Sequence, residues 1–466
     1  YREWGTELVH HLNGQWAFAL WDRDIERVLL SRDPLGIRPL YHTRVGDALL
    51  FASEIKALMC DLRVPRRFRP WGLAESFMLW APQPDRSVFE NIEQLPPGAI
   101  GILRQGEPEL QIRKYWYPEF TATVPYPASV EATHPDNADL DELAARLRSA
   151  LTQAARLRFL RSDVPVGVYI SGGLDSAILA SVLAQGGTRY SAFSIGFEDA
   201  EFDETREQDI LADHLGISVD RLSVSRADVE RLFPDAVLHA EQPVLRTAAA
   251  PLMLLARHAR DHGRWVVLTG EGADELFGGY DLFREHLLRR SMVGSDGTPP
   301  TVSGLYDWQA RSPLSNPELA RMYFDRSHDV SGPCASHIRR WWSGSQLVRF
   351  FEPGFLATTP PDVYGSIAST VAARLPRAFA QWGPLEQAQY LEITLLFPGY
   401  LLSAQSDRMM MTHGVEGRFP FLDPAVVRLA LSLESSAKID GAVTKKILRR
   451  AFGELLPPEI VNGSKQ

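Results

Sequence analysis

The sequence predicts an α+β domain built on antiparallel sheet, followed by an α/β domain built on parallel sheet that ends in a helical part. Short β-rich runs separated by turns fill the first quarter of the chain, strand and helix patterns alternate through the middle, and helical patterns dominate after about residue 297. The predicted units are residues 1–117, a connection over 118–138, and residues 139–466.

The first domain is predicted from runs rich in β-branched and aromatic residues, namely GQWAFALWD, RVLLSRD, ALLFASEI, AIGILR and IRKYWYP. Turns between such short runs are typical of an antiparallel sheet. The string WYPEFTATVPYPASVEATHPDN follows, with four prolines and little periodicity. It indicates an exposed connection between two domains.

The second domain is predicted to open with a helix. Asp139 with Glu142 three residues later gives a capping-box pattern, and leucines follow at helical spacing. The runs VPVGVYI, YSAFSIGF, SVDRLSV and WVVLTG then alternate with the helical patterns AILASVLAQ, ETREQDILADHL and APLMLLARHAR. Alternating strands and helices predict a largely parallel sheet.

Charge and composition exclude several classes of function. The formal net charge of −9 disfavours polyanion binding, so no nucleic-acid partner is predicted. The longest apolar stretch, residues 391–402, is interrupted by polar residues and a proline and is too short to cross a bilayer. Cys60 and Cys334 lie far apart without metal-binding spacing, which favours a reducing compartment. We expect a cytoplasmic protein without a membrane partner, and the sequence leaves a homodimer open.

The strongest local signal is VPVGVYI followed directly by SGGLDSAILA. A strand that feeds a helix N-terminus presents free backbone N–H groups, and glycines let an anion approach the backbone. We therefore predict that Ser171, Gly172, Gly173 and Ser176 bind phosphate. Asp175 is a carboxylate beside an anion site and needs a cation, for which Mg²⁺ is the natural choice. The structural alternative is a tight turn capped by serine.

This loop is not of the Walker type, because GxxxxGK[ST] occurs nowhere and no GxGxxG follows a strand. SGGLDS resembles the pyrophosphate loop of the ATP pyrophosphatase family. The resemblance implies that ATP is bound and is cleaved between its α and β phosphates to make an acyl-adenylate.

A second loop, in WVVLTGEGADELFGGY, places Thr269, Gly270, Glu271 and Asp274 after another buried strand. In an open parallel sheet, ligands bind in the crevice beyond the carboxyl ends of the strands, so both loops are predicted to face one pocket. Asp175 and Asp274 would then share Mg²⁺ and pyrophosphate. The structural alternative is a helix start with acids favoured by the helix dipole.

The same string resembles the second signature of asparagine synthetases. By that resemblance Thr269 and Gly270 contact the nucleotide, and Glu271 acts near the reacting centre. The later strings SDRMMMTHGVEGRFPFLDPAVV and GAVTKKILRRAF resemble further signatures of this family, and Lys445 aligns with the family's lysine. A cation there would offset charge on the phosphate and on the leaving pyrophosphate. The alternatives are the neighbouring Lys446 and an ordinary solvated helix residue.

Other positions matched by the resemblance have less specific patterns. Tyr169 and Ile195 fall where the family lines its adenine pocket, although both also suit ordinary strand residues. Tyr280 would reach toward the active centre or pack as an aromatic residue. For Arg418 and Asp423 the structural alternative is an ion pair that holds the PFLD turn.

The string HLNGQWAFALWDRDIERVLLSRDPLGIRPLYH, with LLFASEIKAL after it, is similar to the later part of the glutaminase domain of class II amidotransferases, an N-terminal-nucleophile (Ntn) fold. In that family an N-terminal cysteine, helped by its own α-amino group, attacks glutamine. Neither Cys60 nor Cys334 is terminal, so we expect the front of this domain to lie outside this sequence. The alternative is an inactive glutaminase domain in an enzyme that uses free ammonia.

The resemblances imply a glutamine-dependent asparagine synthetase. ATP with Mg²⁺ would adenylate aspartate, and ammonia from glutamine would form the amide. One rival is a natural-product amidotransferase or ring-closing synthetase acting on another carboxylate, since β-lactam synthetases and lasso-peptide cyclases resemble the same plan. A second rival is a nucleotide-binding scaffold without turnover.

Overall fold

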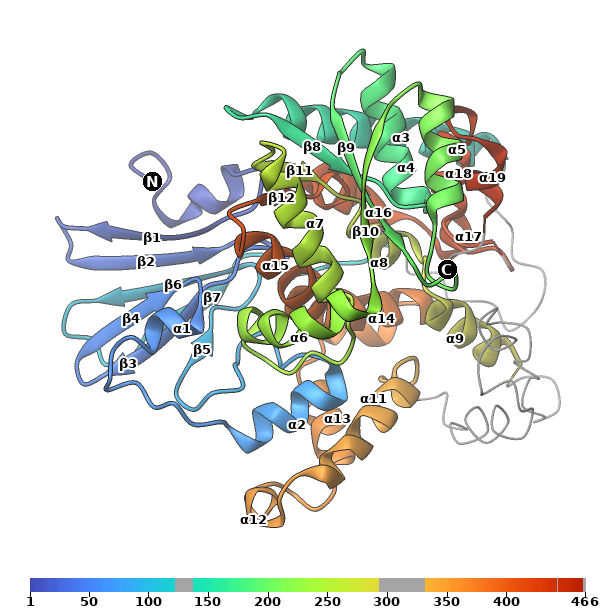
Figure 1. Ribbon diagram of the computed structural model, residues 1–466. Coiled ribbons are helices and arrows are strands. Elements are labelled where there is room, and N and C mark those ends of the chain that lie inside the picture. Colours follow the sequence, from blue (N-terminus) through green and yellow to red (C-terminus); the bar gives the residue numbers. More distant parts are fainter. Residues whose placement is uncertain (122–136, 293–331, 442, 464–466) are drawn as a thin grey trace.

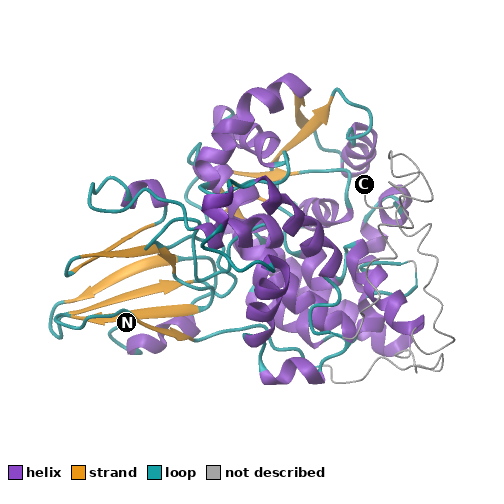
Figure 2. Cartoon of the chain, turned by 90° about the horizontal axis from the view of Figure 1, so that it is seen from below, coloured by secondary structure: helices purple, strands orange, loops and turns teal. Residues whose placement is uncertain are grey.

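The protein, described here by a computed structural model, forms two lobes that lie side by side (Figure 1). The structure describes residues 1–121, 137–292, 332–441 and 443–463. Most of the predicted connection over 118–138 therefore lies outside the described residues. The strands of the first lobe stand apart from the helices that surround the second sheet (Figure 2).

Two antiparallel sheets form the first lobe. Leu29 packs with Ile100 in one hydrophobic cluster, whereas the next residue, Leu30, packs with Leu95 in another. Successive strand residues point to opposite faces, so both faces of this strand are covered. The sheet orders are β1-β2-β6-β7 and β4-β3-β5. The elements are β1 (Ala17–Asp22), β2 (Arg27–Arg32), β3 (Tyr41–Val45), β4 (Ala48–Ala52), α1 (Ile55–Leu58), α2 (Pro70–Leu79), β5 (Glu93–Gln94), β6 (Ala99–Arg104) and β7 (Gln111–Lys114).

The second lobe is built on a parallel sheet with the order β10-β9-β8-β11-β12 among the described residues. From β8 the chain adds β9 and β10 on one side and then crosses to β11 on the other. The strand order thus reverses between β8 and β11, where doubly wound sheets bind ligands. The strands are β8 (Val166–Tyr169), β9 (Ser191–Phe197), β10 (Val219–Val224), β11 (Val266–Leu268) and β12 (Glu416–Arg418). The fold class predicted from the sequence is confirmed.

Helices cover this sheet and make up the rest of the lobe (Figure 1). The first begins at Asn137, so Asp139 lies in its first turn and not at its cap, where its charge still suits the positive end of the helix. A π-helical segment spans residues 392–407. The helices are α3 (Asn137–Leu160), α4 (Leu174–Gln185), α5 (Thr205–Leu215), α6 (Arg226–Ala240), α7 (Ala249–Asp261), α8 (Ala273–Phe277), α9 (Asp281–Met292), α11 (Ile338–Ser345), α12 (Pro353–Leu356), α13 (Val363–Ala373), α14 (Pro384–Leu391), α15 (Arg408–Met411), α16 (Pro424–Ser432), α17 (Ser435–Lys438), α18 (Lys446–Phe452) and α19 (Pro458–Asn462).

Contacts of buried charged side chains join the two lobes. The carboxylate of Glu241, at the end of α6, accepts the backbone N–H groups of Ile55 and Lys56 at 2.8 and 2.6 Å. The same carboxylate pairs with Arg408 at 2.6 Å. Asp407 pairs with Arg38 of the first lobe. Removing one partner of such a buried pair leaves an uncompensated charge, so these contacts fix how the lobes sit together.

Helix α2 belongs to the first lobe by sequence but packs against α11 of the second. Its residues Ala74 and Met78 share a hydrophobic cluster with the core of the second lobe. The two lobes therefore share apolar contacts as well as ion pairs. In the described part of the chain, none of the helices has the length and apolar character needed to cross a bilayer.

Candidate active site

A cavity of about 530 Å³ lies at the carboxyl ends of β8 and β11. The pairing of these strands places Leu268 beside Val168, so the loops that follow them leave the sheet next to each other. The cavity lining includes all twelve residues that the sequence predicts to bind the nucleotide or metal or to act in catalysis. They are Tyr169, Ser171, Gly172, Gly173, Asp175, Ser176, Ile195, Thr269, Gly270, Glu271, Asp274 and Lys445.

The loop between β8 and α4 offers backbone donors to an anion. Hydrogen bonds hold it in shape: the Ser171 N–H donates to Ser176 Oγ at 3.0 Å, and the Gly173 N–H donates to Ser171 Oγ at 3.2 Å. The Gly172 N–H donates to a carboxylate oxygen of Glu204 at 2.8 Å. A carboxylate oxygen thus already accepts from the Gly172 N–H, and a phosphate oxygen could accept from the same donor.

Lys445 joins the two acidic loops. Its Nζ lies 2.8 and 2.6 Å from the carboxylate oxygens of Asp175 and 2.7 Å from Asp274 Oδ1. Gly270 and Gly279 allow this approach. A Cβ on Gly270 would lie 3.0 Å from the Asp175 side chain, and a Cβ on Gly279 would overlap Asp274 and Lys445. The site therefore depends on close packing of three loops that are far apart in the sequence.

The charge of Lys445 is stabilised by its position. Burial disfavours the ammonium ion, but Asp175 and Asp274 outweigh that effect and hold the Lys445 pKa well above its ordinary value. The residue also has a positive φ of 53°, a conformation that costs free energy for a side chain other than glycine. Lys446, by contrast, pairs with Asp440 and is absent from the described cavity lining.

The carboxylates of Asp175 and Asp274 fit a magnesium ion. Their oxygens converge on one point, which the Lys445 ammonium now occupies, and carboxylates are the ligands that Mg²⁺ prefers in proteins. The residues present therefore supply oxygen donors and a cation side by side. The Lys445 ammonium and a magnesium ion held by the carboxylates can each neutralise part of the negative charge of a polyphosphate.

The remaining predicted residues line other parts of the cavity. The Glu271 N–H donates to Thr269 Oγ1 at 3.3 Å, which orients the turn that carries the Glu271 side chain. Tyr169 and Ile195 lie on neighbouring strands. The Tyr169 hydroxyl is buried without a hydrogen-bond partner among the described residues. A buried polar group without a partner is costly, and a bound ligand with an acceptor would satisfy it.

Glu275 and Tyr280 form a pair behind the acidic loop. The Tyr280 hydroxyl donates to the Glu275 carboxylate, and neither residue is part of the described cavity lining. Burial, with the nearby charge of Asp274, raises the Glu275 pKa to about 8. Tyr280 thus packs beside the site and positions Glu275.

Arg418 and Asp423 do not pair with each other, so the structural alternative of an ion pair between them at the PFLD turn does not hold. Arg418 donates to the carbonyl oxygens of Arg158 and Arg161. Asp423 pairs with Arg158 at 2.7 Å and caps α16 through the Ala425 N–H. Both residues still hold this turn, but each does so through α3.

Several cavity residues were missed from the sequence, and two of them carried a signal. Glu204 follows β9, whose carboxyl end lies at the same sheet edge as that of β8. Arg449 comes four residues after Lys445, a helical spacing in the sequence, although Lys445 itself directly precedes α18. The other missed residues are Ile170, Leu174, Phe197, Phe202, Glu207, Gln208, Leu252, Leu255, Gly279, Ser406, Met410, Thr444, Glu459, Ile460 and Gly463.

The chain is similar to known proteins over its whole length. A family model described as asparagine synthase matches residues 146–466, and one described as a glutamine amidotransferase domain matches residues 1–116. A putative glutamine-hydrolysing asparagine synthetase of Mycobacterium tuberculosis is 31% identical over 100% of this chain and 68% of its own length.

Two further relatives differ from each other in their named activity. A glutamine-hydrolysing asparagine synthetase of Bacillus subtilis is 28% identical over 100% of this chain and 69% of its own length. An amidase of Gibberella zeae is 27% identical over 100% of this chain and 71% of its own length. Similarity at this level extends to relatives with more than one named activity.

Proposed function

We propose a function from the premise that this chain belongs to the asparagine synthase family, whose model matches residues 146–466. The chain is an ATP-dependent ligase that forms an amide. The finer proposal is that it adenylates the side-chain carboxylate of aspartate and then forms asparagine with ammonia released from glutamine. The observation that carries it is Lys445 held between Asp175 and Asp274 at the mouth of the SGGLDS loop.

The proposed first step is attack of an aspartate carboxylate oxygen on the α-phosphorus of ATP. This carboxylate oxygen forms the new bond to the α-phosphorus. The bond from the α-phosphorus to the oxygen that bridges to the β-phosphorus breaks, and pyrophosphate leaves. We assign the phosphates to the loop of residues 171–173, where a phosphate oxygen would take the place of the Glu204 carboxylate at the Gly172 N–H, and Lys445 lies where it can offset charge on the leaving group. Mg²⁺, held by Asp175 and Asp274, would supply further charge neutralisation.

The proposed second step forms the amide. The ammonia lone pair attacks the acyl carbon, AMP leaves with the bonding electrons, and one proton is lost from nitrogen. Glu271 lies in the same cavity and is the group we assign to take that proton. Glutamine as the nitrogen source is supported by the amidotransferase match over residues 1–116.

The experiment is an assay of acceptor-dependent ATP cleavage with ammonium as the nitrogen source, which bypasses glutamine hydrolysis. We expect aspartate to release AMP and pyrophosphate in equal amounts and to yield asparagine. Nucleotide binding without acceptor-dependent products would refute the enzymatic role. Replacing ammonium by glutamine then tests the nitrogen source separately.

A second candidate is amide formation on a carboxylate other than aspartate. It is favoured by the amidase of Gibberella zeae, which is similar over the whole of this chain. A panel of carboxylic acids in the same assay separates the two candidates. Pyrophosphate release with another acid but not with aspartate would support the second and exclude asparagine synthesis.

A further inference from the structure

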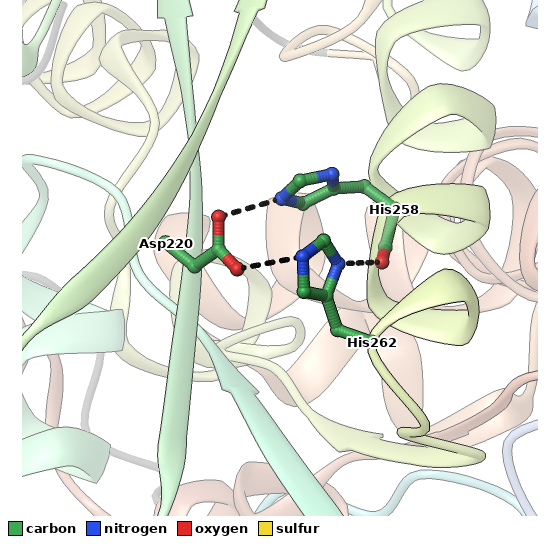
Figure 3. Close-up of side chains that lie close together, drawn as sticks. All are labelled: Asp220, His258 and His262. Atoms are coloured by element: carbon green, nitrogen blue, oxygen red, sulfur yellow. Dashed lines mark hydrogen bonds and ion pairs between the residues drawn. The ribbon is translucent and has the colours of Figure 1, made fainter.

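Three side chains outside the active-site cavity converge at the edge of the parallel sheet (Figure 3). Asp220 lies on the edge strand β10, His258 on the last turn of α7, and His262 directly after that helix. Asp220 Oδ1 lies 2.8 Å from His258 Nε2, and Asp220 Oδ2 lies 3.3 Å from His262 Nε2. One nitrogen or oxygen atom from each residue lies within 4.8 Å of the other two.

A hydrogen bond fixes the proton on His262. Its Nδ1 lies 2.8 Å from the backbone carbonyl oxygen of His258, and a carbonyl oxygen only accepts, so Nδ1 carries the proton. In a neutral imidazole the other nitrogen, Nε2, then has a lone pair, which faces the Asp220 carboxylate. Two acceptors that face each other need a cation between them, either a proton or a metal ion.

The surroundings favour a metal ion. Histidines that ligate metals commonly donate their second ring N–H to a backbone carbonyl, as His262 does here. The two histidines are four residues apart at the carboxyl end of α7, where the negative end of the helix dipole favours a cation. The ring of buried Phe193 contacts both imidazoles and supports them from the sheet side.

We propose that Asp220, His258 and His262 form a binding site for a divalent transition metal ion such as Zn²⁺. Two imidazoles and one carboxylate suit Zn²⁺, Co²⁺ or Ni²⁺ better than Mg²⁺. Tetrahedral zinc with bonds of about 2.0–2.2 Å places ligand atoms about 3.3–3.6 Å apart. The observed separations, 3.3 Å from Asp220 Oδ2 to His262 and 2.8 Å from Asp220 Oδ1 to His258, require the second to open by roughly 0.5–0.8 Å.

Solvent completes the coordination. The side chains of Asp220 and His262 are 41% and 48% exposed, so water can take the fourth position. The ion bridges the edge strand β10 to helix α7, whose residues Leu252 and Leu255 line the active-site cavity. It therefore acts as a clamp on a helix that forms one wall of that cavity.

The test uses Co²⁺ as a visible probe on the whole chain, with Mg²⁺ in excess so that carboxylate sites are filled. We expect one Co²⁺ per chain with the absorption of a tetrahedral site, displaced by Zn²⁺. His258→Ala, His262→Ala and Asp220→Asn should each weaken the affinity by at least about tenfold, since each removes one of three protein ligands. His10→Ala, an exposed histidine that pairs with Glu7, is the matched control and should bind as the native chain does.

Amide hydrogen exchange gives a readout that does not depend on a variant's folding. Zn²⁺ added to the native chain should slow exchange in β10 and in the last turn of α7, because the ion ties these two elements together. Unchanged Co²⁺ affinity in the three variants overturns the proposal. So does protection by Zn²⁺ that is confined to other elements.

Discussion

Replacing Lys445 by alanine tests the centre of the proposed site. The change leaves the carboxylates of Asp175 and Asp274 facing each other without their shared cation. Breaking a buried ion pair by removing one partner costs roughly 3–5 kcal/mol. The side chains of Asp175 and Asp274 are 19% and 16% exposed, so water relieves part of this cost. We therefore expect Lys445→Ala to be less stable by about 3 kcal/mol.

The effect of Lys445→Ala on catalysis is expected to be larger than its effect on stability. Removing one group that stabilises charge in a transition state lowers kcat roughly 10²- to 10³-fold. The assay is aspartate-dependent pyrophosphate release at saturating ATP, with urea unfolding of the same sample to measure stability. Because only folded protein is assayed below the unfolding transition, the two losses are measured separately.

Lys446→Ala is the matched control for Lys445→Ala. The neighbouring lysine pairs with Asp440 at 2.8 Å, and their side chains are 25% and 45% exposed. A surface pair of this kind contributes about 0–1 kcal/mol, so stability and pyrophosphate release should stay near the native values. Full pyrophosphate release by Lys445→Ala, or an equal loss in Lys446→Ala, would refute the role assigned to Lys445.

Three further changes probe the same site. Mg²⁺ should raise the melting temperature of Lys445→Ala more than that of the native chain, because the two carboxylates then lack their ammonium partner; adding Asp274→Asn should remove the difference. Gly279→Ala should abolish pyrophosphate release because its Cβ would overlap Lys445, whereas Gly453→Ala, whose Cβ meets nothing nearer than 3.7 Å, should stay active. The Glu275 carboxyl ionises near 4.5 when unfolded and near 8 when folded, so the folded state holds the extra proton between these values. Stability should therefore fall as pH rises from about 4.5 to about 8 and then level off, and urea unfolding across this range should show a shallower fall in Glu275→Gln.

The sequence predicts the floor of the site well because local rules determine it. A loop of Ser171, Gly172 and Gly173 just after a buried strand can present its N–H groups in few ways, and two such strands in a parallel sheet open at one edge. Thr269 and Gly270 follow from the same rule applied to β11. Hydrophobic periodicity and the residues of the turns are enough to predict these positions, since each loop directly follows its strand.

The walls of the site depend on contacts between distant segments, which local rules do not determine. Lys445 lies 270 residues after its partner Asp175, and only a family resemblance singled it out. Glu204 reaches Gly172 because β9 pairs beside β8, an order that the separate strand patterns leave open. Arg418 and Asp423 show the converse: opposite charges near in sequence suggested a pair, but each bonds instead to Arg158 near the end of α3. Which charged side chains pair in this protein is thus decided by which elements pack together. The chemistry of each loop could be predicted from its own residues, whereas the partners of its charged side chains could be found only from the fold.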